Sequence, residues 1–110
     1  MKNGYRNLKT RFLAFPEQTQ VLHIVSDLKK AKNVLDLYPS TARNHLYRAM
    51  ILLDYMLEDP RWNVKRGELL RLREAMGSFL FHEKSYANME QLLIAALHLE
   101  PKAYRAFYNC

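Results

Sequence analysis

The apolar residues of this chain recur at intervals of three and four positions, which is the period of an α-helix with one buried face. The first such stripe runs from Glu17 to Tyr38 and includes Val21, Ile24, Val25, Leu28, Ala31 and Leu35. Pro16 suits the first turn of a helix there, because the N–H that proline lacks has no partner inside the helix. The helix must end before Pro39, since a residue that precedes proline is disfavoured in the α region.

A second stripe, from Thr41 to Glu58, is apolar on more than one side. One face carries Ala42, Leu46, Ala49, Met50, Leu53, Met56 and Leu57, and much of the other carries Tyr47, Ile51, Leu52 and Tyr55. A helix that is apolar nearly all round is buried nearly all round, so we expect this segment to be the central element of the fold. Ser40 and Thr41 offer side-chain oxygens that we expect to cap the free amides at its start.

Two more stripes and a short C-terminal segment follow the break at Asp59-Pro60. One stripe runs from Arg61 to about His82, the next runs from Tyr86 to Leu99, and Pro101 opens a last short turn of helix. No segment alternates with a period of two for long enough to indicate a strand. The sequence therefore predicts an all-α fold, a compact bundle of four to five helices with short connections.

The first fifteen residues fit two descriptions. Leu8, Phe12 and Phe15 have the spacing of a short helix, whereas Asn3-Gly4 favours a loose basic arm. Residues 1–110 are expected to form a single helical domain, because a chain of 110 residues buries about two thirds of its unfolded surface and needs no disulfide or metal to fold.

What the sequence lacks disfavours several classes of protein. The start of the chain has no apolar signal-peptide core, and no apolar run approaches the roughly 20 residues that span a bilayer, so we expect a cytoplasmic protein without membrane contact. Three glycines form no phosphate-binding loop, and the four histidines are not spaced as metal ligands on one helix face. We therefore expect no enzyme, with no catalytic residues, no metal and no cofactor.

The basic residues are concentrated in the first half of the chain. Residues 1–48 carry nine basic and three acidic residues, a net charge of +6, whereas residues 49–110 carry eight of each. A basic field attracts polyanions when it is gathered on one surface, and Lys29, Lys30 and Lys32 form one such cluster. The alternative is that the excess charge only keeps the protein soluble.

The segment from Pro39 to Leu46 has the outline of a helix-turn-helix, because it opens a helix after a turn of three or four residues. In that motif, polar residues near the start of the second helix reach base edges and phosphates. Here the candidates are Ser40, Thr41, Arg43, Asn44 and Arg48. Arginine and asparagine make bidentate contacts to guanine and adenine. The same residues also fit a solvated helix face behind a cap.

Residues 35–46 resemble the recognition helix of LuxR-type DNA-binding domains, in which the pattern S-P-x-T-V-x-x-H-L follows the turn. The residues that carry the resemblance are Pro39, Thr41, Ala42, His45 and Leu46. The resemblance implies a DNA-binding helix at this position. Residues 73–101 resemble one tetratricopeptide repeat through Gly77, Leu93, Ala96 and Pro101, which implies a packed helix hairpin.

The N-terminal segment is a second candidate for nucleic-acid contact. Arg6, Lys9 and Arg11 precede the first acidic residue, and Tyr5 and Phe12 are interleaved with them. Basic side chains neutralise phosphates and aromatic rings stack on unpaired bases. The alternative is that the apolar residues close the bundle while the charges keep this end soluble.

Together these features favour a small, non-enzymatic nucleic-acid-binding protein for DNA or RNA. The alternative is an adaptor or inhibitor, of the kind carried by mobile elements or phages, that docks on a larger protein through an aromatic and methionine surface. A second copy of the chain is a further candidate partner. Tyr104, Phe107 and Tyr108 are the candidate contact residues of such a surface. Because their segment is too short to be helical alone, it must pack, and we expect these rings to pack inward.

Overall fold

The computed structural model describes residues 4–81 and 88–108, and these residues fold into six α-helices and one 3-10 helix without a strand. The elements in chain order are α1 (Gly4–Leu13), α2 (Glu17–Val34), α3 (Pro39–Leu57), the 3-10 helix η1 (Pro60–Lys65), α4 (Arg66–Phe81), α5 (Met89–Leu97) and α6 (Pro101–Tyr108). The prediction of an all-α bundle is confirmed, with more helices than the four to five expected.

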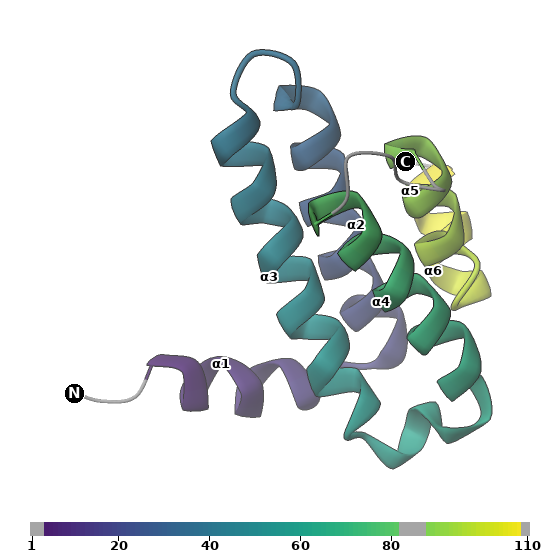
Figure 1. Cartoon of the computed structure of the whole chain (residues 1–110). Coiled ribbons are helices and arrows are strands. Elements are labelled where there is room, and N and C mark those ends of the chain that lie inside the picture. Colours follow the sequence, from purple (N-terminus) through teal and green to yellow (C-terminus); the bar gives the residue numbers. More distant parts are fainter. Residues whose placement is uncertain (1–3, 82–87, 109–110) are drawn as a thin grey trace.

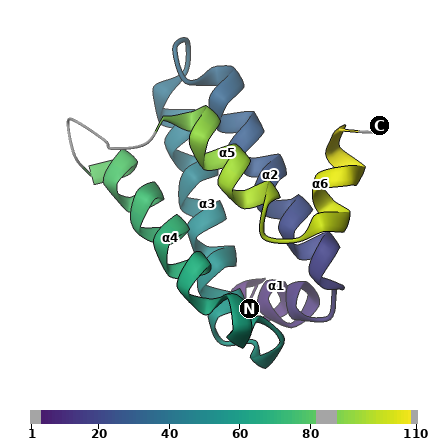
Figure 2. The same cartoon turned by 90° about the vertical axis from the view of Figure 1, so that its right-hand side faces the viewer.

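Helices α2 and α3 form a long antiparallel hairpin that organises the rest of the fold (Figure 1). Helix α4 packs against α3, α5 packs against α2, and α4 and α5 also contact each other (Figure 2). Helix α6 packs on α2 and α5, while α1 lies across the C-terminal end of α3 (Figure 1). None of the helices in the described ranges is long and apolar enough to cross a membrane.

The core is built from the apolar stripes read in the sequence. Its fully buried large side chains come from nearly every element and include Phe12, Ile24, Leu28, Leu46, Leu53, Met56, Leu69, Met76, Leu92 and Leu97. The expectation that the stripe from Thr41 to Glu58 is buried nearly all round is wrong. Tyr47 is 40% exposed, and Ile51 and Tyr55 are only partly buried, because α1 and α4 cover this outer side of α3 only in part.

Two helix starts differ from the predictions, both because proline occupies a first helical position. Helix α3 begins at Pro39 with Tyr38 as its N-cap, and no side chain caps it. The expected caps, Ser40 and Thr41, therefore lie inside the first turn. The segment that begins at Pro60 first forms the 3-10 helix η1, capped by the Asp59 carboxylate, which accepts a hydrogen bond from the Arg61 N–H at 3.0 Å.

The N-terminal segment is helical over Gly4–Leu13, so the loose-arm alternative is wrong for these residues. Phe12 is buried, and its ring lies 6.4 Å from that of Phe15 and 6.3 Å from that of Tyr55 on α3. The short helix α1 therefore closes one end of the bundle, as its apolar spacing predicted. Residues 1–3 lie outside the described part of the chain.

Replacing Gly77 with alanine should raise the free energy of unfolding by about 0.5–1 kcal/mol, because glycine costs a helix interior backbone entropy. Gly77 is in the interior of α4, and an added Cβ would lie 3.8 Å from the Cε atom of Met50, an ordinary van der Waals distance. Chemical denaturation measures the change. A loss of stability would mean that α3 and α4 pack more closely at this point than the structure places them.

Candidate nucleic-acid interface

Four of the cations predicted to bind nucleic acid already have partners within the protein. The Nζ atom of Lys9 lies 2.7 Å from a carboxylate oxygen of Glu58, and that of Lys32 lies 2.5 Å from one of Glu90. Arg48 pairs with the Asp27 carboxylate of α2, with its Nε 3.2 Å from Oδ2. Lys29 lies over the ring of Phe107, 5.1 Å from its centre. The +6 charge of the first half is thus partly neutralised by the fold.

The other predicted contact residues are exposed, but Arg43 and Arg48 lie on different sides of α3. Arg11, Lys30, Ser40, Thr41, Arg43 and Asn44 are exposed, with no side-chain partner in the part of the chain that the structure describes. Arg43 precedes Arg48 by five residues, which turns the two side chains about 140° apart around α3. The side chain of Arg6 lies outside what the structure describes.

The arrangement of α2 and α3 also differs from a helix-turn-helix. That motif crosses its two helices at about 90–120°, so that the end of the second helix projects into a groove of DNA. Here the two helices lie side by side and antiparallel along most of their length (Figures 1 and 2). The hairpin therefore offers a broad face built by two helices.

A polar depression of about 200 Å³ lies on this face, lined only by residues of α2 and α3. We call it the hairpin groove; its residues are His23, Ser26, Asp27, Lys30, His45 and Arg48. On α2, His23 lies three and four residues before Ser26 and Asp27, and Lys30 lies four and three residues after them, while His45 and Arg48 of α3 are three residues apart. Each set therefore lies on one side of its helix. The groove thus brings together two residues of the predicted set, Lys30 and Arg48.

Asp27 holds the two sides of the hairpin groove together. It is buried, although it is acidic, and its Oδ1 lies 3.3 Å from Nδ1 of His45 while its Oδ2 faces Arg48. The acid therefore fixes the orientation of a ring and a guanidinium at the floor of the groove.

The far end of the groove is fixed by aromatic contacts. The ring of His23 stacks on that of Phe15 at 5.1 Å, with the planes 4° apart, and meets Phe12 edge to face at 6.1 Å.

The hairpin groove has a net positive charge, because its two cations, Lys30 and Arg48, outnumber its one carboxylate, Asp27. Ammonium and guanidinium groups that converge from two helices are suited to phosphate oxygens.

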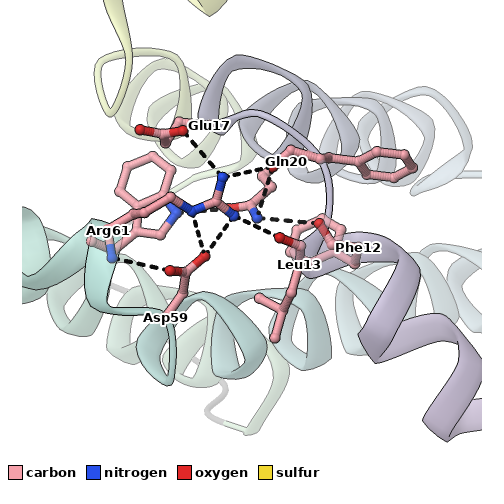
Figure 3. Close-up of polar contacts among 8 residues, drawn as sticks. Phe12, Leu13, Glu17, Gln20, Asp59 and Arg61 are labelled. Carbon is pink, nitrogen blue, oxygen red and sulfur yellow. Dashed lines mark hydrogen bonds and ion pairs between the residues drawn. The ribbon is translucent and has the colours of Figure 1, made fainter.

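A second polar cluster, which sequence reasoning missed, joins α1, α2 and η1 (Figure 3). We call it the Arg61 network. The guanidinium of Arg61 donates to Asp59 at 2.7 and 2.9 Å, and to the carbonyls of Leu13 at 2.7 Å and Phe15 at 3.0 Å. It also lies 3.3 Å from a carboxylate oxygen of Glu17. These contacts tie the end of α1 to the segment that follows α3.

Gln20 completes the Arg61 network from inside the core. Its amide N–H groups donate to the carbonyls of Phe12 and Phe15, and its carbonyl accepts the indole N–H of Trp62 at 2.7 Å. Hydrogen bonds from Arg61 hold the pKa of the Asp59 carboxyl below its ordinary value, against burial, which raises it. The saturated contacts of this network indicate a structural role.

Helix α6 places the predicted partner-binding residues at the surface to different degrees. Ala103 is buried and Phe107 is partly buried, so these two anchor the helix. Tyr104 and Tyr108 are 39% and 52% exposed, so the expectation that they pack inward is wrong. The physical reason is that α6 packs on α2 and α5 from one side only.

The histidines and carboxylates form no metal site in the described residues, where no three His, Cys, Asp or Glu side chains group closely enough.

The resemblances to LuxR-type domains and to a tetratricopeptide repeat stay predictions. No family model matches the chain, and searches of curated proteins and of solved structures find no match either.

Proposed function

We propose that the protein binds nucleic acid through the outer face of the α2–α3 hairpin, with a backbone phosphate held in the hairpin groove. The observation that carries this proposal is the convergence of Lys30 from α2 and Arg48 from α3 on one polar depression of about 200 Å³. Asp27 orients Arg48 there without neutralising Lys30. Phosphate contacts of this type supply affinity and carry no sequence information.

The antiparallel arrangement of α2 and α3 favours contacts to the nucleic-acid backbone over sequence-specific contacts to base edges. A recognition helix must enter the major groove with its N-terminal end, whereas α3 is flanked by α2 along its length. Arg43 and Asn44, the side chains suited to base edges, lie outside the hairpin groove. We therefore propose binding with little sequence preference.

Binding measured at two salt concentrations tests this function. Three to four phosphate contacts should weaken duplex binding about 40- to 150-fold between 50 and 200 mM salt, because each neutralised phosphate releases condensed counterions. Lys30→Gln should weaken binding and reduce the slope of log affinity against log salt concentration by about the value of one phosphate contact. Arg71→Gln is the matched control, because Arg71 is an exposed cation on α4, outside the hairpin groove.

Two results would contradict the proposal. One is the absence of binding to duplex and single-stranded probes at 50 mM salt. The other is an equal loss of affinity in Lys30→Gln and Arg71→Gln, which would mean that net charge, and no particular face, attracts the probe.

An adaptor that docks on another protein is the second candidate. It is favoured by the rings of Tyr47 and Phe81, which lie 6.1 Å apart on α3 and α4, with Phe81 61% exposed. Exposed aromatic side chains are enriched at protein interfaces. Association of the pure protein with itself, measured by light scattering, gives the first test of this candidate.

A further inference from the structure

The solvent-facing side of α2 connects the hairpin groove with α6. Lys29 and Lys30 are adjacent, so their side chains point about 100° apart around the helix. Lys29 contacts the ring of Phe107 on α6, whereas Lys30 lines the hairpin groove. Exposed Ser26 and Asn33 lie between these directions, three or four residues from each lysine. A polar strip with two cations therefore runs across α2 from α6 to α3.

Three aromatic rings lie in a row beside this strip. The ring of His98 stacks on that of Tyr104 at 5.3 Å, with the planes 13° apart. The ring of Tyr108 lies 4.8 Å from that of Tyr104 and is tilted against it by 50°. We call this set the aromatic row. Such a row can be extended by a nucleobase, since every base has a π-face. Phe107 meets Tyr108 edge to face at 5.1 Å and so links the row to Lys29.

Two carboxylates close to the strip are already paired with other side chains of the described residues. Glu90 at the start of α5 is held by Lys32, and Asp27 is engaged by His45 and Arg48. Lys30 has no partner among the residues that the structure describes. The combination of free or ring-bound cations with exposed aromatic rings is the pattern of surfaces that bind unpaired nucleic acid.

We propose that the nucleic acid bound by this protein is single-stranded, with a base stacked on the aromatic row and phosphates held along α2 as far as the hairpin groove. This inference rests on the proposed function and deepens it. A duplex keeps its bases stacked inside, so it can reach the groove but not the aromatic row. The strip spans one helix diameter, about 10–12 Å.

Fluorescence anisotropy with a 12-nucleotide oligo-dT probe, alone and as a duplex with oligo-dA, tests the inference at 50 mM salt. The full chain should bind the single strand more tightly than the duplex. Tyr108→Leu should weaken single-strand binding about 5- to 150-fold and leave duplex binding unchanged, because only the single strand loses a stacked base. Tyr108→Phe, which keeps the ring, should restore binding. Phe81→Leu is the control for loss of an exposed ring elsewhere.

The possible outcomes separate this inference from the function on which it rests. If duplex and single strand bind equally and Tyr108→Leu affects neither, the phosphate contacts stand and the stacking is refuted. If no probe binds, both the inference and the proposed function are refuted. If Tyr108→Leu changes the oligomeric state instead of single-strand binding, α6 is a protein interface and the inference is overturned. Thermal melting of Tyr108→Leu close to that of the parent chain shows that the fold is intact.

Discussion

Replacing Arg61 with methionine should lower the free energy of unfolding by about 2–3 kcal/mol. The guanidinium donates to a buried carboxylate and to the main-chain carbonyls of Leu13, which ends α1, and Phe15, which follows it. Hydrogen bonds to charged groups contribute about 1.5–3 kcal/mol each. We expect less than the sum, because the Arg61 side chain is 36% exposed and water replaces part of what is lost. Urea denaturation measures the change.

The matched control for Arg61→Met is Arg66→Met. The side chain of Arg66 is also exposed, and within the described part of the chain it makes one hydrogen bond, to the carbonyl of Leu57 at 2.8 Å. Its replacement should cost less than about 1 kcal/mol. Equal losses in the two variants would show that the Arg61 network contributes no more than an ordinary surface contact.

The acid dependence of stability gives a second measurement on the Arg61 network. Because the folded-state pKa of Asp59 is lowered, its contribution is present above the unfolded pKa of about 4 and is lost as the pH falls through the folded value. In Arg61→Met the main cause of the lowered pKa is gone. The stability difference between the parent chain and Arg61→Met should therefore narrow below about pH 4. A difference that stays constant down to pH 2 would contradict this assignment.

The helices could be predicted from the sequence because their causes are local. Apolar residues at intervals of three and four, and prolines at 16, 39, 60 and 101, set the period and the breaks that the structure has. The 3-10 helix at Pro60–Lys65 was missed. The sequence pattern favours an α-helix that begins at Arg61, whereas in the structure Asp59 caps a 3-10 helix over the same residues. The local pattern does not decide between these two geometries.

The polar networks could not be predicted because their partners are far apart in the chain. Gln20 and Asp27 do leave a signal, since each interrupts the apolar stripe of α2 at a position that packs inward. A buried polar side chain needs a partner, so both positions call for one. Their partners, Trp62 for Gln20 and Arg48 for Asp27, lie 42 and 21 residues away, and the sequence pattern does not identify them.

The charge of the first half illustrates the same limit. A count along the chain predicts a basic surface, but the fold brings Glu58 and Glu90 from the neutral half to Lys9 and Lys32. What remains as a candidate interface is a smaller set around Lys30 and Arg48, together with histidines whose spacing along the chain gave no signal. Their grouping depends on the register of α2 against α3, which only the tertiary structure supplies.

Replacing Leu53 with alanine should lower the free energy of unfolding by about 3–5 kcal/mol, the largest loss that we expect from one substitution. Leu53 is fully buried on the inner side of α3, where a deleted side chain leaves a cavity that the packed helices fill only in part. Tyr47→Ala, on the outer side, should cost about 1 kcal/mol or less in a single chain. Thermal and chemical denaturation across a range of protein concentrations measure both changes in stability.

If Tyr47→Ala lowers the free energy of unfolding as much as Leu53→Ala does, and the loss grows with protein concentration, a second copy of the chain covers the outer side of α3. That result would contradict a solvent-exposed outer face and favour the adaptor over the nucleic-acid-binding protein, because the stripe from Thr41 to Glu58 would then be buried nearly all round by association.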